Sequence, residues 1–190
     1  PEDNYAQWTN HGYIYRKDRV RTYGEMVHGY ADTASHYHYR LVAMGFEELS
    51  TGEKFVLNIN HLRSKRGTGA ESNEKRMANV DSLLVMLDKI EGEQMFDDAD
   101  ILLVGDYNSY AQEEPIQTIV RAGYADMIVR NDSTSYSYVY HSEAGCLDRV
   151  FASKTMAKQV QKVAVYHVNT DYFYSRGFKR GLDNTMFRYA

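Results

Sequence analysis

The stretch D-I-L-L-V-G-D-Y-N-S-Y, residues 100–110, begins with an apolar run and ends in polar residues. Residues 101–104 are apolar without interruption and are followed by Gly105, a pattern that predicts a strand buried on both faces. Asp106 and Asn108 come next, at the carboxyl end of that strand. Their i, i+2 spacing lets both side chains point the same way where the backbone stays extended.

The Asp106/Asn108 pair offers two kinds of polar group at one strand end. A carboxylate supplies a hard oxygen ligand, and an amide supplies a neutral donor and acceptor. Together they suit a divalent cation and a phosphate oxygen. The alternative is an Asx turn that closes the strand. These residues alone leave both interpretations open.

Composition limits the class of protein. A chain of 190 residues fits one domain, and 43% hydrophobic with 25% charged residues is typical of a globular protein. The net charge of −4 argues against binding nucleic acid mainly through overall positive charge, although a local basic patch remains compatible with it. The single cysteine, Cys146, excludes an intrachain disulfide and a Cys-based zinc site. The sequence has neither an apolar run of about 18 residues nor a signal-peptide pattern.

Two strands and a tight turn are predicted in the first third of the chain. Residues 38–49 and 54–62 have strand patterns, and Thr51-Gly52 between them predicts an antiparallel hairpin. Alternation in the second strand places four side chains on one face: Phe55, Leu57, Ile59 and His61. His61 falls at the end of the strand, where it leaves the core.

Apolar residues at 3.6-residue spacing predict a long helix over residues 74–91, which Gly92 ends. Pro115 suits a first helical position and predicts a short helix over residues 116–122. The other predicted elements are two strands within 11–23, a loop at 24–37, and strands at 136–140, 147–152 and 161–169. The simplest interpretation is a single α/β domain over residues 1–190 that is rich in antiparallel strands.

Polar side chains lie at or near three predicted strand ends: His61, the Asp106/Asn108 pair and Asp148. Four nearby cations are candidate phosphate contacts: Arg40, Arg63, Lys65 and Arg149. Such a set suits metal-assisted attack on a phosphodiester, because the metal neutralises phosphate charge, the acids hold it or orient a base, and the histidine serves a developing oxyanion. Each part also has a structural alternative, namely a hydrogen-bonded histidine, a surface ion pair at L-D-R and a solvated basic loop.

Seven stretches carry a family resemblance: Y-R-K-D-R-V (15–20), Y-R-L-V-A (39–43), N-H-L-R-S-K (60–65), G-D-Y-N-S-Y-A-Q-E-E-P-I (105–116), A-G-Y-A-D (122–126), Y-S-Y-V-Y-H-S-E-A-G-C-L-D-R-V-F-A-S (136–153) and Y-H-V-N-T-D (166–171). In order and content they resemble the endonuclease/exonuclease/phosphatase superfamily, specifically its bacterial extracellular-nuclease-like branch. The resemblance implies an α/β (α+β) fold, a four-layer αββα sandwich of the DNase I-like type. It also implies divalent-metal-dependent hydrolysis of phosphate esters.

The resemblance assigns roles to individual residues. His61 resembles the histidine that binds the scissile phosphate or assists the leaving oxygen. Asp106 and Asn108 resemble the pair that positions the attacking water and the phosphate near the metal. Asp148 resembles the carboxylate that orients the catalytic histidine, and Arg40 resembles an arginine that faces the phosphate.

The implied cofactor is a divalent metal, Mg²⁺ ahead of Mn²⁺ or Ca²⁺, with Asp106 and Asn108 on the metal side. Arg40, Arg63 and Lys65 are the predicted phosphate-binding residues. The implied substrate is nucleic acid, either DNA or RNA. An extracellular, periplasmic or cell-surface location is expected by the same resemblance.

Two family motifs have no counterpart in these 190 residues: an N-terminal segment with a metal-binding glutamate, and a terminal S-D-H-D-P. We therefore expect a domain that is incomplete at both ends, inactive or nearly so by itself, and prone to self-association through exposed sheet edges. The predicted function is a metal-dependent phosphodiester hydrolase of the extracellular-nuclease type. The alternatives are a phosphatase or phosphodiesterase that acts on small or lipid phosphate esters, and a non-catalytic binding domain that retains the fold.

Overall fold

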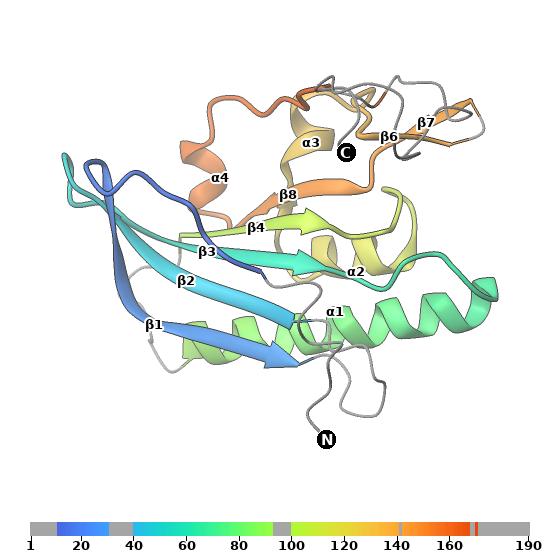
Figure 1. The fold of residues 1–190 in the computed structure, drawn as a ribbon, viewed down its shortest axis with the longest axis horizontal. Coiled ribbons are helices and arrows are strands. Elements are labelled where there is room, and N and C mark those ends of the chain that lie inside the picture. Colours follow the sequence, from blue (N-terminus) through green and yellow to red (C-terminus); the bar gives the residue numbers. More distant parts are fainter. Residues whose placement is uncertain (1–10, 31–39, 93–99, 141, 168–169, 171–190) are drawn as a thin grey trace, which may run out of the picture.

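A six-stranded sheet with the order β1-β2-β3-β4-β8-β5 organises the protein (Figure 1). The computed structural model describes residues 11–30, 40–92, 100–140, 142–167 and 170. The strands of this sheet are β1 (Val20–Tyr30), β2 (Arg40–Glu48), β3 (Lys54–His61), β4 (Ile101–Asp106), β5 (Ala125–Asp126) and β8 (Asp148–Ala152). A separate hairpin pairs β6 (Tyr138–Tyr140) with β7 (Glu143–Gly145). The helices are α1 (Gly69–Gly92), α2 (Glu114–Arg121), α3 (Met127–Asn131) and α4 (Met156–Gln159).

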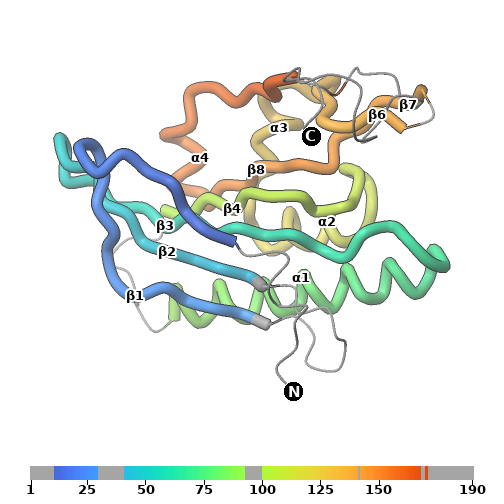
Figure 2. The backbone as a smooth tube through the Cα atoms, viewed as in Figure 1, coloured from blue at the N-terminus to red at the C-terminus, as the bar shows by residue number. Residues whose placement is uncertain are grey.

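The sheet is mixed, and one parallel pair lies at its centre. β2 runs antiparallel to both β1 and β3, β3 and β4 are parallel, and β8 runs antiparallel to both β4 and β5. A parallel pair needs a crossover connection, and α1 lies on that connection between β3 and β4. Figure 2 shows the chain leaving β3 and entering α1, which lies below β3 and β4 in this view. The carboxyl ends of β3 and β4 therefore meet at the same end of the sheet.

The main hydrophobic core lies between the sheet and the helices α1 and α2. Leu83 of α1 and Ile119 of α2 are fully buried in it, beside Leu41, Leu103 and Phe151 from the strands. Full burial of one such side chain contributes about 1.5–3 kcal/mol to the stability of the folded protein. The predicted long helix is confirmed, with its apolar stripe in this core, although it begins at Gly69.

The opposite face of the sheet is only partly covered. In β4, Ile101 and Leu103 have no exposed surface, whereas Leu102 and Val104 are half-buried. The prediction that β4 is buried on both faces is therefore wrong. The side chains of β3 that alternation placed together, Phe55 to His61, also lie on the half-buried face. A smaller cluster on α3, β8 and α4 packs against part of this face: Met127, Ala152, Met156 and Ala157.

The predicted hairpin at Thr51-Gly52 is confirmed, because β2 pairs antiparallel with β3 and Gly52 adopts a positive φ of 78°. The predicted loop at 24–37 is wrong over its first part, since β1 continues to Tyr30. The predicted strand at 161–169 is also wrong, because residues 161–167 form no strand. The short elements β5, α3 and α4 lack a clear period of their own. They depend on packing against β8 and its neighbours.

The α/β class is confirmed, and the described residues contain one large sheet with the helices against it. A second large sheet of a four-layer sandwich is not among them. Within the same described part of the chain, no helix combines the length and the apolar character needed to cross a membrane.

Candidate active site

His61, Asp106 and Asp148 lie in one row across three neighbouring strands. His61 is opposite Asp106 in the β3–β4 register, and Asp106 is opposite Asp148 in the β4–β8 register. This happens because β3 and β4 end where the antiparallel strand β8 begins. His61 Nε2 lies 3.8 Å from Asp106 Oδ2, and both side chains are more than a third exposed, at 43% and 37%. The structure therefore brings these three predicted residues together at one end of the sheet.

Asn108 completes this group through a tight turn. Its backbone N–H donates to Asp106 Oδ1 at 2.8 Å, and its side-chain amide donates to the Leu62 carbonyl at 3.0 Å. Asn108 adopts a positive φ of 48°, a conformation that asparagine tolerates better than most residues. The Asx turn that the sequence left as an alternative is present. It uses Oδ1 of Asp106, whereas Oδ2 is the oxygen near His61.

Gly105 allows β4 and β3 to approach closely just before the turn. Its φ is +144°, and a Cβ placed there would lie 1.8 Å from the carbonyl oxygen of Asn60. Both the conformation and the space require glycine. The predicted need for Gly105 at this turn is supported by this geometry.

Beneath the site, Tyr107 anchors the turn in the core. Its side chain is fully buried, its hydroxyl accepts a hydrogen bond from Asn60 Nδ2 at 3.0 Å, and its ring packs edge-on against Phe151. Burial raises the pKa of the Tyr107 hydroxyl, which keeps it neutral. Its backbone N–H donates to the Leu147 carbonyl at 2.9 Å, so the turn is also tied to the segment that leads into Asp148.

The surroundings of Asp106 disfavour the charged form of its carboxyl group. Burial raises the pKa of its carboxyl above the ordinary value, and the negative charge of Asp148 raises it further. The Asn108 N–H and His61 act in the opposite direction. Two carboxylates side by side at one end of the sheet favour a cation between or beside them, because a cation relieves their repulsion.

Asp106→Asn is expected to stabilise the fold slightly at neutral pH. The raised pKa means that the folded chain binds this proton more tightly than the unfolded chain. Ionised Asp106 therefore lowers stability as the pH rises through its raised pKa, and protonation restores that stability as the pH falls. Water screens the partly exposed side chain, so the gain at pH 7 is below about 1 kcal/mol. Urea unfolding at pH 7 and pH 4 should show a gain that shrinks at the lower pH. A clear loss at pH 7 would contradict this account.

Two of the predicted phosphate contacts, Lys65 and Arg63, are already in contact with other groups. Lys65 forms an ion pair with Glu113, and its ammonium lies 4.7 Å from the centre of the Tyr110 ring. The half-buried Arg63 donates its backbone N–H to Asn79 Oδ1 at 3.0 Å. Their phosphate-binding role stays a prediction. The side chain of Arg40 lies outside the described residues, although its backbone begins β2.

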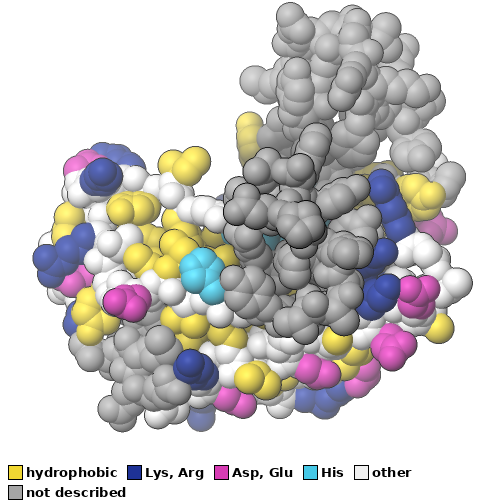
Figure 3. All heavy atoms as spheres, turned by 60° about the horizontal axis from the view of Figure 1, so that its bottom comes forward, with side chains coloured by type: hydrophobic (Ala, Val, Ile, Leu, Met, Phe, Trp, Pro, Cys, Tyr) yellow, Lys and Arg dark blue, Asp and Glu magenta, His cyan; other side chains and the backbone are white. Residues whose placement is uncertain are grey.

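The interpretation of Arg149 as a phosphate contact is wrong. Its side chain is only 2% exposed and pairs with Asp126, whose side chain is 8% exposed. The surface in Figure 3 shows Lys and Arg side chains among Asp and Glu side chains along its described part, in keeping with a net charge of only −4.

Sequence reasoning missed several residues that shape the site. Glu113 pairs with Lys65 and also accepts the Tyr110 N–H at 3.1 Å. The hydroxyl oxygen of Ser137 accepts the backbone N–H of Asp148 at 3.0 Å and so orients the start of β8. Pro115 marked the start of α2, but the pairing of Glu113 with Lys65, 48 residues away, has no local signal.

The residues that are present fit a divalent cation in part. Asp106 offers a carboxylate oxygen, and Asn108 an amide oxygen, next to the negative charge of Asp148. Mg²⁺ commonly takes one or two carboxylates and completes its shell with water and substrate phosphate. In the described part of the chain, no group of three or more His, Cys, Asp or Glu side chains is arranged to hold a metal. A cation at this site would therefore depend on water and substrate for its other ligands.

Several solved structures share this architecture. A mannosyl-6-phosphatase from Bacteroides thetaiotaomicron is similar with a TM-score of 0.59 and 16% identity, over 74% of this chain and 55% of that one. An endonuclease/exonuclease/phosphatase family protein from the same organism is similar with a TM-score of 0.56 and 16% identity, over 74% and 54%. D. rerio TDP2 complexed with a single-strand DNA product is similar with a TM-score of 0.52 and 22% identity, over 74% and 56%.

No protein-family model and no curated relative matches the sequence. The chain spans about half the length of these solved structures, 54–56% in the three cases. At these identities the likeness establishes the fold. The chain has the DNase I-like fold that it shares with these solved structures, one of which is an endonuclease/exonuclease/phosphatase family protein.

Proposed function

We propose that this chain is part of a divalent-metal-dependent phosphoester hydrolase, centred on the sheet end that carries His61, Asp106 and Asp148. One observation carries the proposal: β3, β4 and β8 bring these three side chains into a single row, with Asn108 turned back onto Asp106. The fold supports it, because the similar structures include a mannosyl-6-phosphatase and TDP2 with a DNA product.

Each of these side chains has a distinct chemical part in such a reaction. A bound divalent cation would neutralise phosphate charge and assist the attack of water. Asp106 would hold that cation, and the Asn108 amide, oriented by its bond to the Leu62 carbonyl, would present its oxygen. His61, whose Nε2 lies 3.8 Å from Asp106 Oδ2, would donate a hydrogen bond to a phosphoryl oxygen. The charge of Asp148 strengthens the preference of the site for a cation.

For the substrate we propose a nucleic-acid phosphodiester, cleaved by a nuclease of the extracellular type. The TDP2 complex with single-strand DNA product supports this choice. The mannosyl-6-phosphatase supports a second candidate, a sugar phosphate or other small phosphate monoester. The row of His61, Asp106 and Asp148 serves either substrate, because both present the same phosphoryl group to it.

Asp106→Asn is expected to reduce hydrolysis by roughly 10²–10⁴-fold in kcat/KM, because a neutral amide neither neutralises the cation nor orients the histidine. Because this chain spans only about half the length of the similar structures and is expected to have little activity by itself, the assay uses a longer protein that contains it. It offers plasmid DNA, a single-stranded oligonucleotide and a panel of sugar phosphates with Mg²⁺ or Mn²⁺. Asp81→Asn, which changes an exposed carboxylate on α1, is the matched control and should leave the rate unchanged.

The outcomes separate the alternatives. Cleavage of DNA that depends on Asp106 supports the nuclease, and turnover of a sugar phosphate alone supports the second candidate. Mn²⁺ should also broaden the NMR signals of Asp106 and Asn108 selectively, and Asp106→Asn should abolish this effect. Equal rates and equal broadening in the wild type and Asp106→Asn would overturn the proposed centre.

A further inference from the structure

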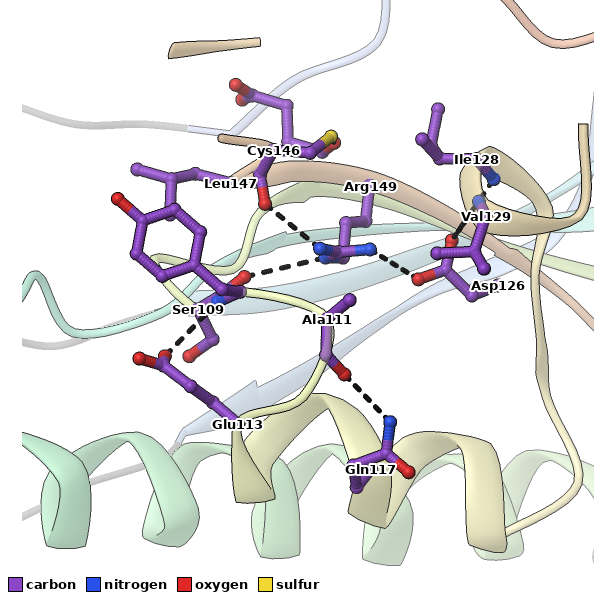
Figure 4. Close-up of polar contacts among 12 residues, drawn as sticks. Ser109, Ala111, Glu113, Gln117, Asp126, Ile128, Val129, Cys146, Leu147 and Arg149 are labelled. Atoms are coloured by element: carbon purple, nitrogen blue, oxygen red, sulfur yellow. Dashed lines mark hydrogen bonds and ion pairs between the residues drawn. The ribbon is translucent and has the colours of Figure 1, made fainter. Parts of the chain in front are cut away.

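Arg149 joins three segments of the chain through one buried guanidinium. It forms an ion pair with the Asp126 carboxylate, and it donates to the Cys146 carbonyl at 3.0 Å and to the Ser109 carbonyl at 3.4 Å. Figure 4 shows the guanidinium between the loop that carries Ser109, the Cys146 segment and the start of α3. The side chains of Arg149 and Asp126 are only 2% and 8% exposed. Solvent therefore has little part in these contacts.

The two carbonyl partners of Arg149 lie directly beside the candidate site. Ser109 follows Asn108 in sequence, and Cys146 lies two residues before Asp148. Arg149 itself is the Cα partner of Gly105 in the β4–β8 register. One side chain thus connects the loop after β4 with the segment that carries Asp148.

Asp126 holds this arginine in place independently of the site. Its Oδ1 accepts the backbone N–H groups of Ile128 and Val129, at 3.1 and 3.2 Å, and so caps α3. Its other oxygen pairs with Arg149. The carboxylate is therefore fixed by α3, and it orients the guanidinium whose remaining donors reach the two carbonyls. A planar fork with several donors is required for this, and a lysine ammonium cannot reproduce it.

We propose that Arg149 is a positioning residue, which sets the distance between the Asp106/Asn108 turn and Asp148 for phosphoester hydrolysis. This inference rests on the proposed function of the site. The contacts of Arg149 have two separate roles. The ion pair with Asp126 stabilises the fold. The hydrogen bonds to the Ser109 and Cys146 carbonyls hold the loop after β4 against the segment that carries Asp148. A small displacement of such groups slows a reaction without weakening substrate binding to the same degree.

The test compares Arg149→Lys with a charge-neutral double variant, Asp126→Asn with Arg149→Met. The lysine keeps the charge but loses the fork, and the double variant leaves no unpaired charge buried. Both are expected to lower kcat about 10- to 100-fold, with KM changed by less than about threefold. Exchange of the Tyr107 and Asn108 amides, measured by NMR in the folded state, should accelerate about tenfold or more, because their partners are Leu147 and Asp106. Arg121→Lys, an exposed arginine on α2 paired with Glu114, is the control and should change neither quantity.

The readouts distinguish failure of the inference from failure of the proposed function. Unchanged kcat and unchanged amide exchange in a folded Arg149→Lys overturn the positioning role. A drop in melting temperature with unchanged kcat overturns it as well, since that is the result of a purely structural ion pair. Absence of phosphoester hydrolysis in the wild-type form of the longer protein used for the assay overturns the proposed function, and with it the catalytic role of the positioning, whatever the amide exchange shows.

Discussion

Gly105→Ala is expected to lower the free energy of unfolding by about 3–5 kcal/mol, or to prevent folding altogether. The added methyl would lie 1.8 Å from the Asn60 carbonyl oxygen, so β3 and β4 would have to separate at the site. The φ of +144° adds backbone strain of about 1–3 kcal/mol for any residue with a Cβ, and overpacking adds a similar amount. Urea unfolding followed by circular dichroism measures the loss. Since a domain has only about 5–15 kcal/mol of stability, this is a large fraction.

Gly52→Ala separates strain from collision in this experiment. Gly52 has a positive φ of 78°, but a Cβ there meets no atom within 4 Å. We expect a loss of about 1 kcal/mol from the backbone conformation alone. A Gly105→Ala variant that is no less stable than Gly52→Ala would show that the close approach of the strands is not required.

Asp126→Asn is expected to destabilise the protein by about 3–5 kcal/mol, because it leaves the Arg149 guanidinium buried without a counter-charge. The asparagine oxygen can still accept the N–H groups of Ile128 and Val129, so the helix cap survives and the lost charge is the main change. The measurement is again urea unfolding at neutral pH. Adding Arg149→Met to Asp126→Asn should recover much of the loss, since neither charge then remains buried.

Asp132→Asn is the matched control for this prediction. Asp132 is exposed and also accepts a backbone N–H, that of Thr134 at 2.9 Å. Its replacement should change the free energy of unfolding by less than about 0.5 kcal/mol. If Asp126→Asn and Asp132→Asn have equal effects, the buried ion pair contributes nothing specific to this fold.

Local sequence patterns correctly predicted the elements whose signal lies within a few neighbouring residues. The long helix and the hairpin at Thr51-Gly52 were correctly predicted, because helical period and tight-turn residues act over a few positions. The first part of the predicted loop at 24–37 belongs to β1, an edge strand of mixed polarity whose strand state depends on pairing with β2. The apolar run of β4 overstated its burial, because Leu102 and Val104 face the less covered side of the sheet.

The candidate site also has features that local sequence predicted and features that it did not. His61, Asp106, Asn108 and Asp148 could be singled out from motifs, and the structure places the first two and Asp148 in one row. Sequence motifs could not show which Lys and Arg side chains are exposed to solvent. Arg149 has a charged side chain like any surface arginine, and only its pairing with Asp126 shows that it is buried.

By itself the sequence determined the α/β class, the long helix, the hairpin and the identity of the polar residues at the strand ends. These depend on period, turn residues and side-chain chemistry, which are properties of short segments. The tertiary structure alone decided that three strand ends meet, that Gly105 must lie against Asn60, and that Arg149 spans the loop and β8 from inside the protein. The physical reason is that register and burial arise from contacts between segments 40 or more residues apart in places, as between Arg149 and Ser109.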